Sequence, residues 1–363
     1  YEISACLVGS EMCIRDSGCT SPDMATYYMT NRSCPYSKSI LERAFEGGYN
    51  FLDALIGQEC CCTMNRMEQY FDYCELIPKD KFFVACIDMP INRSEWHVGY
   101  YRRQMEKKIL EPLRETYGVD FSEERLRAAI AEHNELCRII TEMGDMRKAE
   151  NPVITGYEFH VMQLVSLTCP KYLVLPLLRE TLEELKTREP EPKPWFRARV
   201  MVTGAEIDDP EFTKMLEMCG AMVVADRYCF GSMPGREQIE IRDGETALDA
   251  IARHYLYNNH CPRAMGPENL RARKLYVYNK AMEYGAEGVI IESMKFCEYW
   301  GYERAQDSAW LTEGFALPGT LPVCQIERDY TCAASGQLRT RFQAFVESLE
   351  IKRIQAAEQK EGA

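Results

Sequence analysis

Residues 285–297 are Gly-Ala-Glu-Gly-Val-Ile-Ile-Glu-Ser-Met-Lys-Phe-Cys: a glycine, an apolar run at 288–292 and a closing cysteine. The preceding stretch, 269–283, carries apolar residues at helical spacing. A helix, a glycine stop and a short apolar run are together typical of an α/β unit with a buried parallel strand. The segment therefore predicts a helix, then a strand over 288–292, then a loop that holds Cys297.

An earlier segment repeats this pattern. It has a helical stretch at 37–45, then Gly48, then an apolar run at 51–56. The run is followed by three cysteines, Cys60, Cys61 and Cys62. In both copies a cysteine lies twelve positions after the glycine, at Cys60 and at Cys297. Residues just beyond the carboxyl ends of parallel strands line the crevice where α/β proteins bind ligands, so two copies that each deliver thiols predict a metal cluster and redox chemistry.

A Cys-Pro pair precedes each copy, as Cys34-Pro35 and Cys261-Pro262. Proline favours the first turn of a helix, and a thiolate there is stabilised by free amide N–H groups and by the helix dipole. Cluster iron binds thiolates, so Cys34 and Cys261 are candidate ligands. The alternative for each is a helix cap with a buried thiol.

The cysteine spacing separates possible metals. Zinc also takes thiolates, but the chain has neither the Cys-x-x-Cys pairs of zinc ribbons nor the Cys-x-x-Cys-x-x-Cys run of bacterial ferredoxins. The candidate ligands are distributed along the chain from Cys34 to Cys297. This wide separation favours a cluster in a cleft between domains over a metal site that only stabilises a local fold. Such a cluster can leave one iron open to substrate.

Composition excludes several classes of protein. The chain has 363 residues, 17 cysteines and a net charge of −13. No run approaches the roughly 18 apolar residues needed to cross a bilayer, and the acidic balance argues against nucleic-acid binding. So many cysteines in a long chain do not fit a small disulfide scaffold, and a reducing cytoplasm is the expected compartment.

Residues 1–17 are expected to be an artefact. Residues 6–17, Cys-Leu-Val-Gly-Ser-Glu-Met-Cys-Ile-Arg-Asp-Ser, resemble the translation of a transposon-type sequencing adapter. We exclude this segment from the fold argument, as one would exclude a cloning scar, and expect the natural N-terminus to be missing.

The rest of the chain predicts an α/β fold: two Rossmann-like or flavodoxin-like parallel-sheet domains with a helical insertion between them. The segment Glu-Pro-Glu-Pro-Lys-Pro at 189–194 is the clearest predicted boundary. A closing helix is expected over 337–350, with a fraying tail beyond Ile351. The full division is a truncated N-terminal α/β domain at 18–95, a helical region at 96–188, the linker at 189–194, a C-terminal α/β domain at 195–330, and the closing helix and tail at 331–363.

Two further motifs carry candidate chemistry. Residues 204–210, Gly-Ala-Glu-Ile-Asp-Asp-Pro, place three acids where a strand meets a helix. One of Asp208 and Asp209 is expected to cap the helix, which leaves Glu206 as the candidate for proton transfer. Arg339 and Arg341 open the last helix and suit an anionic ligand such as a phosphate, although paired arginines on a helix are more often solvated. A Gly-x-Gly-x-x-Gly fingerprint for dinucleotides is absent.

Five ordered motifs between Gly204 and Glu347 resemble one known family. They are Gly-Ala-Glu-Ile-Asp-Asp-Pro-Glu-Phe, Val-Val-Ala-Asp-Arg-Tyr-Cys-Phe-Gly-Ser, Cys-Pro-Arg, Glu-Gly-Val-Ile-Ile-Glu-Ser-Met-Lys-Phe-Cys-Glu and Gly-Gln-Leu-Arg-Thr-Arg-Phe-Gln-Ala-Phe-Val-Glu. The chain is similar to the D-component family of 2-hydroxyacyl-CoA dehydratases and benzoyl-CoA reductases over nearly all of residues 19–350.

The resemblance implies a [4Fe-4S] cluster held by three cysteines, Cys34, one of Cys60 and Cys61, and Cys297. The family motif has a single Cys-Asp after the strand that precedes the triplet, and it aligns best on Cys61, with Cys62 in place of the aspartate. The twelve-residue spacing favours Cys60 instead, and the choice stays open.

The resemblance also implies the reaction. One electron added to the thioester of a 2-hydroxyacyl-CoA forms a ketyl radical that can expel hydroxide, and loss of the acidified β-proton leads to enoyl-CoA after the electron returns. The electron must come from the reducing end of the cluster range, roughly −700 mV. The implied partners are an acyl-CoA substrate, a paralogous second subunit and a separate ATP-hydrolysing iron–sulfur activator, with no nucleic acid and no membrane.

Two alternatives share this scaffold. One is a benzoyl-CoA-reductase-like subunit that reduces a ring. The other is a double-cubane iron–sulfur protein, acting as a reductase or an electron carrier, which would need about six cluster thiolates and about eight iron atoms per chain. A zinc-stabilised α/β protein without catalysis is the least favoured interpretation.

Overall fold

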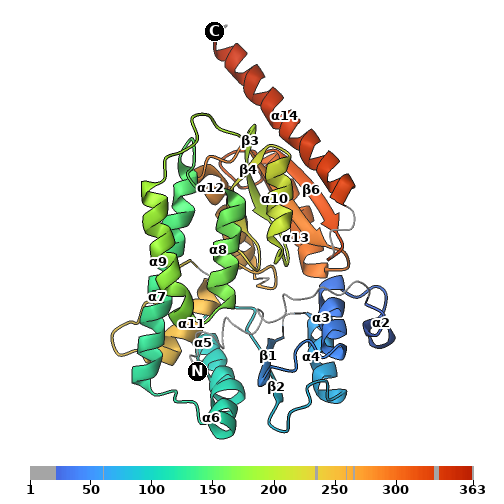
Figure 1. Ribbon diagram of the computed structural model, residues 1–363, viewed down its shortest axis with the longest axis vertical. Coiled ribbons are helices and arrows are strands. Elements are labelled where there is room, and N and C mark those ends of the chain that lie inside the picture. Colours follow the sequence, from blue (N-terminus) through green and yellow to red (C-terminus); the bar gives the residue numbers. More distant parts are fainter. Residues whose placement is uncertain are drawn as a thin grey trace. The chain divides into compact units, whose positions relative to one another are not determined.

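The computed structural model (Figure 1) describes residues 22–59, 61–233, 236–258, 260–264, 266–330 and 335–361. Within them the helices and strands, in chain order, are α2 (Ala25–Tyr28), α3 (Pro35–Phe45), β1 (Ala54–Gln58), α4 (Cys62–Tyr73), β2 (Phe83–Ile87), α5 (Glu95–Met105), the π-helix η2 (Glu106–Leu110), α6 (Glu111–Tyr117), α7 (Glu123–Asp145), the 3-10 helix η3 (Met146–Lys148), α8 (Gly156–Thr168), α9 (Lys171–Thr187), β3 (Ala198–Thr203), α10 (Pro210–Met218), β4 (Ala221–Arg227), α11 (Ala247–Tyr257), α12 (Pro267–Glu283), β5 (Gly288–Met294), α13 (Glu298–Glu313), β6 (Val323–Arg328) and α14 (Ser335–Glu361).

The chain forms two compact units, and it passes between them several times. The first unit consists of Tyr1–Arg138, Val165–Pro176 and Gly235–Gly266. The second consists of Ile139–Leu164, Leu177–Pro234 and Pro267–Ala363. The proline-rich segment 189–194 lies inside the second unit, so the units are not consecutive blocks of sequence.

The first unit contains a two-stranded parallel sheet, in which Ala54 of β1 lies opposite Phe83 of β2. α4 contacts both strands, and η2 contacts β2. The π-helical turn η2 joins α5 to α6, and the Glu111 N–H donates to the Glu106 carbonyl, five residues earlier. Pro112 lies in the first turn of α6.

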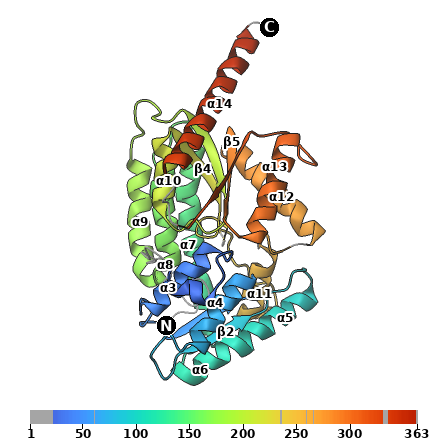
Figure 2. The ribbon, with the colours of Figure 1, turned by 90° about the vertical axis from the view of Figure 1, so that its right-hand side faces the viewer.

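The second unit is built on a four-stranded parallel sheet in the order β4-β3-β5-β6. Figure 2 shows α12 and α13 on one side of this sheet and α10 on the other. Alternate residues of β3 enter the two cores: Val200 and Val202 pack with α10 and α14, whereas Met201 packs with α12. A strand buried on both faces explains the continuous apolar runs of the sequence and confirms the predicted α/β class with parallel sheets.

Three predicted elements differ from the structure. β1 begins at Ala54 rather than at residue 51, because the chain first makes a turn in which the Leu52 N–H donates to the Tyr49 carbonyl. The helix α13 follows Cys297 where no helix was predicted. The closing helix is longer than the predicted 337–350, since α14 continues to Glu361 through good helix formers such as Ala, Gln, Glu and Lys.

Candidate functional site

Cys34 is the N-cap of α3, as the Cys-Pro pair predicts. Pro35 is the first helical residue, and the Cys34 carbonyl accepts a hydrogen bond from the Lys38 N–H at 3.2 Å. The Ser37 hydroxyl donates to the same carbonyl at 2.9 Å. Cys34 is only 8% exposed. The thiol therefore lies at the start of a helix, where free amide N–H groups stabilise negative charge.

Cys61 is the N-cap of α4. Its backbone is extended, its carbonyl accepts from the Asn65 N–H at 3.0 Å, and its sulfur accepts from the Met64 N–H at 3.4 Å. The Thr63 hydroxyl lies 3.3 Å from the same sulfur. Cys62 is the first residue of the helix and is exposed. Of these two cysteines, Cys61 has the sulfur that accepts an amide hydrogen bond, which favours its thiolate form.

Cys297 is the N-cap of α13. The Gly301 N–H donates to its carbonyl at 2.8 Å, and its own N–H donates to the Met294 carbonyl at 3.1 Å, which closes a turn after β5. Phe296 in this turn has φ +61, a left-handed conformation that is uncommon for a non-glycine residue. A strained backbone immediately before a candidate ligand is the kind of outlier that accompanies functional sites.

Cys61 and Cys297 occupy equivalent positions. Each is the third residue after its strand, which ends at Gln58 in β1 and at Met294 in β5, and each caps the next helix. Cys60, the alternative ligand, lies outside the described residues.

The twelve-residue spacing was counted from Gly48 and from Gly285, and these two glycines are not equivalent in the structure. Gly47 (φ +77) and Gly285 (φ +63) are the left-handed residues that end α3 and α12. In both places the following N–H donates to a carbonyl five residues earlier, from Gly48 to Arg43 and from Ala286 to Ala281. Gly48 therefore corresponds in structure to Ala286, and Gly47 corresponds to Gly285. The equal distance of twelve residues from Gly48 to Cys60 and from Gly285 to Cys297 is thus counted from positions that do not correspond.

Cys261 does not open a helix, contrary to the prediction. The Ala264 N–H donates to the Cys261 carbonyl at 3.1 Å in a turn, and α12 begins only at Pro267. Two other cysteines, the half-buried Cys86 and the buried Cys137, have their pKa raised by burial to about 12.

The three N-cap cysteines are distributed over both units. Cys34 and Cys61 belong to the first unit and Cys297 to the second. Across the part of the chain that the structure describes, no group of three or more His, Cys, Asp or Glu side chains is arranged to hold a metal ion.

The loop 204–209 lies at the carboxyl end of β3. Asp209 caps α10 by accepting from the Glu211 N–H at 3.0 Å, which confirms that one of the two aspartates is a helix cap. Glu206 is half-buried, and its backbone carbonyl accepts from the Arg328 guanidinium at 2.7 Å. This contact fixes the peptide that carries the candidate proton-transfer side chain.

Arg328 also ties this loop to β5. Its Nε lies 2.9 Å from the carboxylate of Glu292, which is 0% exposed and accepts from the Ala205 N–H at 2.9 Å. The Tyr330 hydroxyl donates to Asp208 at 2.7 Å. Burial raises the pKa of both Asp208 and Glu292, although Arg328 opposes the effect. Glu292 is not among the site residues predicted from the sequence. The signal that could have pointed to it is a carboxylate at the end of an otherwise apolar run, 288–292.

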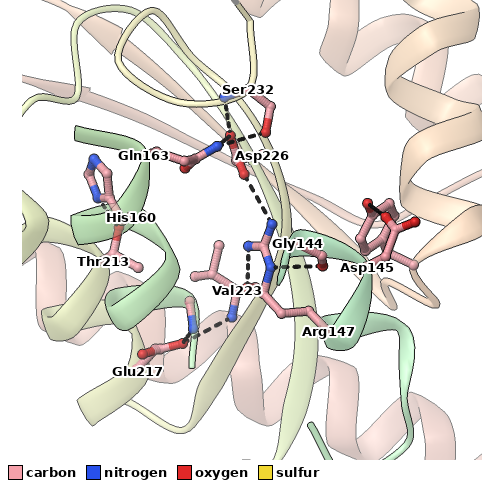
Figure 3. A network of polar contacts seen from close by, with 12 residues as sticks. Gly144, Asp145, Arg147, His160, Gln163, Thr213, Glu217, Val223, Asp226 and Ser232 are labelled. Atoms are coloured by element: carbon pink, nitrogen blue, oxygen red, sulfur yellow. Dashed lines mark hydrogen bonds and ion pairs between the residues drawn. The ribbon is translucent and has the colours of Figure 1, made fainter. Parts of the chain in front are cut away.

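The loop after β4 is held by Asp226 (Figure 3). The Asp226 carboxylate accepts from the Ser232 N–H at 2.6 Å and from the Gln163 amide at 3.3 Å, and it pairs with Arg147 at 3.4 Å. The Cys229 N–H in this loop donates to the Ala205 carbonyl at 3.2 Å. The loops after β3 and β4 are therefore joined at the carboxyl edge of the sheet.

Arg339 and Arg341 lie in the first turns of α14, and both side chains are exposed. Their predicted contact with an anionic ligand stays a prediction. None of the described helices is both long and apolar enough to span a bilayer.

Comparison with known proteins identifies the family. The model of the family "2-hydroxyglutaryl-CoA dehydratase, D-component" matches residues 6–349. The (R)-phenyllactyl-CoA dehydratase beta subunit of Clostridium sporogenes is 25% identical over 330 residues, which cover 91% of this chain and 84% of that protein. The lactoyl-CoA dehydratase subunit beta of Anaerotignum propionicum is 25% identical over 328 residues, which cover 90% of this chain and 82% of that protein.

A reductase subunit is also similar. A benzoyl-CoA reductase subunit of Thauera aromatica is 20% identical over 268 residues, which cover 73% of this chain and 67% of that protein. The predicted resemblance is thus confirmed at the level of the family. Because the family model spans nearly the whole sequence, the chain belongs to the 2-hydroxyglutaryl-CoA dehydratase, D-component family.

Proposed function

We propose that this chain is a subunit of a 2-hydroxyacyl-CoA dehydratase, which removes water from a 2-hydroxyacyl-CoA and yields the enoyl-CoA. The observation that carries the proposal is the shared placement of Cys34, Cys61 and Cys297, each the N-cap of a helix. The relatives named as phenyllactyl-CoA and lactoyl-CoA dehydratase subunits support the substrate class.

The chemistry of these residues fits a [4Fe-4S] cluster. Thiolates are the ligands that cluster iron takes, and a helix N-terminus favours the deprotonated sulfur. We assign Cys34, Cys61 and Cys297 as the proposed ligands and keep Cys60 as the alternative to Cys61. When bound, such a cluster supplies one-electron chemistry and an iron site that can polarise a carbonyl oxygen.

The protein's own groups would position the reactants. The Met64 N–H orients the Cys61 sulfur, and Arg328 fixes the Glu206 peptide at the carboxyl edge of the sheet. In the proposed reaction the Glu206 carboxylate accepts the β-proton of the acyl chain. Arg339 and Arg341 would bind the phosphates of coenzyme A, since guanidinium groups pair well with phosphate oxygens.

The proposed partners are a second, paralogous subunit and an ATP-hydrolysing iron–sulfur activator. The relatives are themselves named as subunits of dehydratases and of a reductase, which supports the second subunit. The cytoplasm is the proposed compartment.

A benzoyl-CoA-reductase-like subunit is the second candidate function, and the similarity to the reductase subunit of Thauera aromatica favours it. Both candidates would use the same three thiols, so metal analysis does not separate them. An activity assay separates them. With the partner subunit and activator supplied, a dehydratase turns over (R)-phenyllactyl-CoA or lactoyl-CoA, whereas a reductase turns over benzoyl-CoA.

The test of the cluster is anaerobic purification with iron and acid-labile sulfide counted. We expect about four iron atoms per chain, as one [4Fe-4S] cluster requires. Serine variants at Cys34, Cys61 and Cys297 should lose the iron, and Cys62→Ser is the matched control for Cys61. Loss of iron in Cys60→Ser but not in Cys61→Ser would reverse that assignment. A chain that binds no iron, or only zinc, would overturn the proposed function.

A further inference from the structure

The inner face of α13 is charged. Its buried side chains are Trp300, Glu303, Asp307 and Leu311, at the three- and four-residue spacing of one helix face. Glu303 is 2% exposed and Asp307 is 1% exposed. We call this face, Trp300 to Leu311, the α13 seam. An ordinary amphipathic helix buries apolar residues here, so two carboxylates need a specific reason.

Arg227, the last residue of β4, meets the middle of the seam. Its guanidinium donates to Glu303 at 3.0 Å and to Asp307 at 3.4 Å. A third bond, to the Thr203 hydroxyl at 3.3 Å, ties the same group to the end of β3. The guanidinium carbon also lies 5.2 Å from the ring centre of Trp300. A single side chain with 0% exposure thus joins two strand ends to three positions of α13.

α12 holds the seam from a second direction. The Lys274 amine lies 3.0 Å from Glu303 and 2.6 Å from Asp307. Arg273 donates to Glu303 at 3.1 Å. Three buried cations from two elements therefore converge on two carboxylates of one helix.

This arrangement fixes how α13 is rotated about its axis. Apolar contact is non-directional, so an apolar seam tolerates small rotations and shifts. By contrast, the planar guanidinium group of an arginine binds carboxylates in a narrow range of orientations. A rotation that separates one ion pair would also leave a buried charge without its partner. Trp300 follows Cys297 by three residues, on the first turn of the helix. Cys297 joins this turn through its carbonyl, which accepts from the N–H of Gly301, the residue after Trp300, at 2.8 Å.

We propose that Arg227 and Lys274 are positioning residues, which hold α13 in the rotation that presents Cys297 to its iron–sulfur cluster. The proposal rests on the proposed function, because it takes Cys297 as a ligand. It predicts that the seam acts on the cluster environment and on the first turn of α13, beyond its contribution to folding.

Arg227→Lys is the sharpest variant, because it keeps the charge and removes the fork. Lys274→Met is the second variant, in case the first does not fold. The control is Phe342→Leu, in the core on the other side of the same sheet. All variants are compared under conditions in which they are folded to the same extent. We expect the electron paramagnetic resonance spectrum and the midpoint potential of the bound cluster to shift in both seam variants and to stay unchanged in the control.

Amide hydrogen exchange of Gly301, whose N–H donates to the Cys297 carbonyl, gives a second readout in the cluster-free chain. We expect faster exchange there in the seam variants than in the control at equal stability. Seam variants that match the control in spectrum, potential and exchange would overturn the inference. A parent chain without iron would overturn the proposed function instead, and the exchange measurement would still decide whether the seam orders the first turn.

Discussion

Gly204 lies against the carboxylate of Glu292. A Cβ at position 204 would come within 2.6 Å of the Glu292 Oε2 and 2.8 Å of its Cβ. Glu292 is fully buried and paired with Arg328, so it has little freedom to move away. The glycine thus allows the loop that carries Glu206 to approach β5 closely.

The first prediction concerns this contact. Gly204→Ala should lower the free energy of unfolding by about 1–3 kcal/mol, the usual cost of overpacking a filled core. Urea denaturation measures it. Gly301→Ala is the matched control, since among the described residues no atom outside the backbone of its own helix lies within 4 Å of the added Cβ, and alanine favours a helix. A neutral Gly204→Ala would show that the loop can move away from β5.

The second prediction concerns acid sensitivity of the first unit. Burial lowers the pKa of His133 to about 3 and that of His254 to about 4. The unfolded chain therefore binds these protons first, and stability present above about pH 6.5 falls as the pH drops toward 4. Each histidine adds a slope of up to about 1.4 kcal/mol per pH unit.

Urea denaturation between pH 7 and pH 4 tests this slope. His254→Asn should flatten it, because asparagine does not titrate. An unchanged slope in His254→Asn would contradict the prediction.

The third prediction concerns Glu217, whose carboxylate accepts from the Val223 N–H at 3.5 Å (Figure 3). The same carboxylate accepts from the Gly156 N–H at 2.7 Å and from the Tyr157 N–H at 3.1 Å. Burial raises the pKa of this carboxyl to about 7 despite these bonds. Its contribution to stability is complete below about pH 4.5 and is lost as the pH rises through 7. Glu217→Gln keeps an acceptor oxygen and removes the ionisation, so its stability should depend less on pH between 4.5 and 7. Thermal unfolding across this range, compared with the parent, decides the matter.

The fourth prediction compares buried and exposed ion pairs. Glu303→Gln should cost about 3–5 kcal/mol, because it leaves three buried cations, Arg227, Arg273 and Lys274, with Asp307 as the one remaining carboxylate of the seam. Glu211→Gln, which breaks the exposed pair with Lys214, should cost less than about 1 kcal/mol. Equal effects in denaturant unfolding would mean that water reaches the α13 seam.

The element pattern followed from local chemistry. The apolar run at 288–292 predicted a buried parallel strand, and β5 (Gly288–Met294), buried at every position, confirms it. Pro35 after Cys34 predicted the start of a helix, because proline suits the first turn and needs no partner for its nitrogen. The family followed from motif order in the same way, since five short motifs together exceed what chance supplies.

The sequence by itself therefore determined the α/β class, the family and Cys34 as a helix cap, because each depends on residues close together in the chain. Tertiary structure alone decided the rest. The equivalence of Cys61 with Cys297 depends on where strands end, which turn geometry sets and a residue count does not. The pairing of Arg227 with Glu303, and of Arg328 with Glu292, joins residues far apart in sequence, and only the packed sheet brings such charges together and shields them from water.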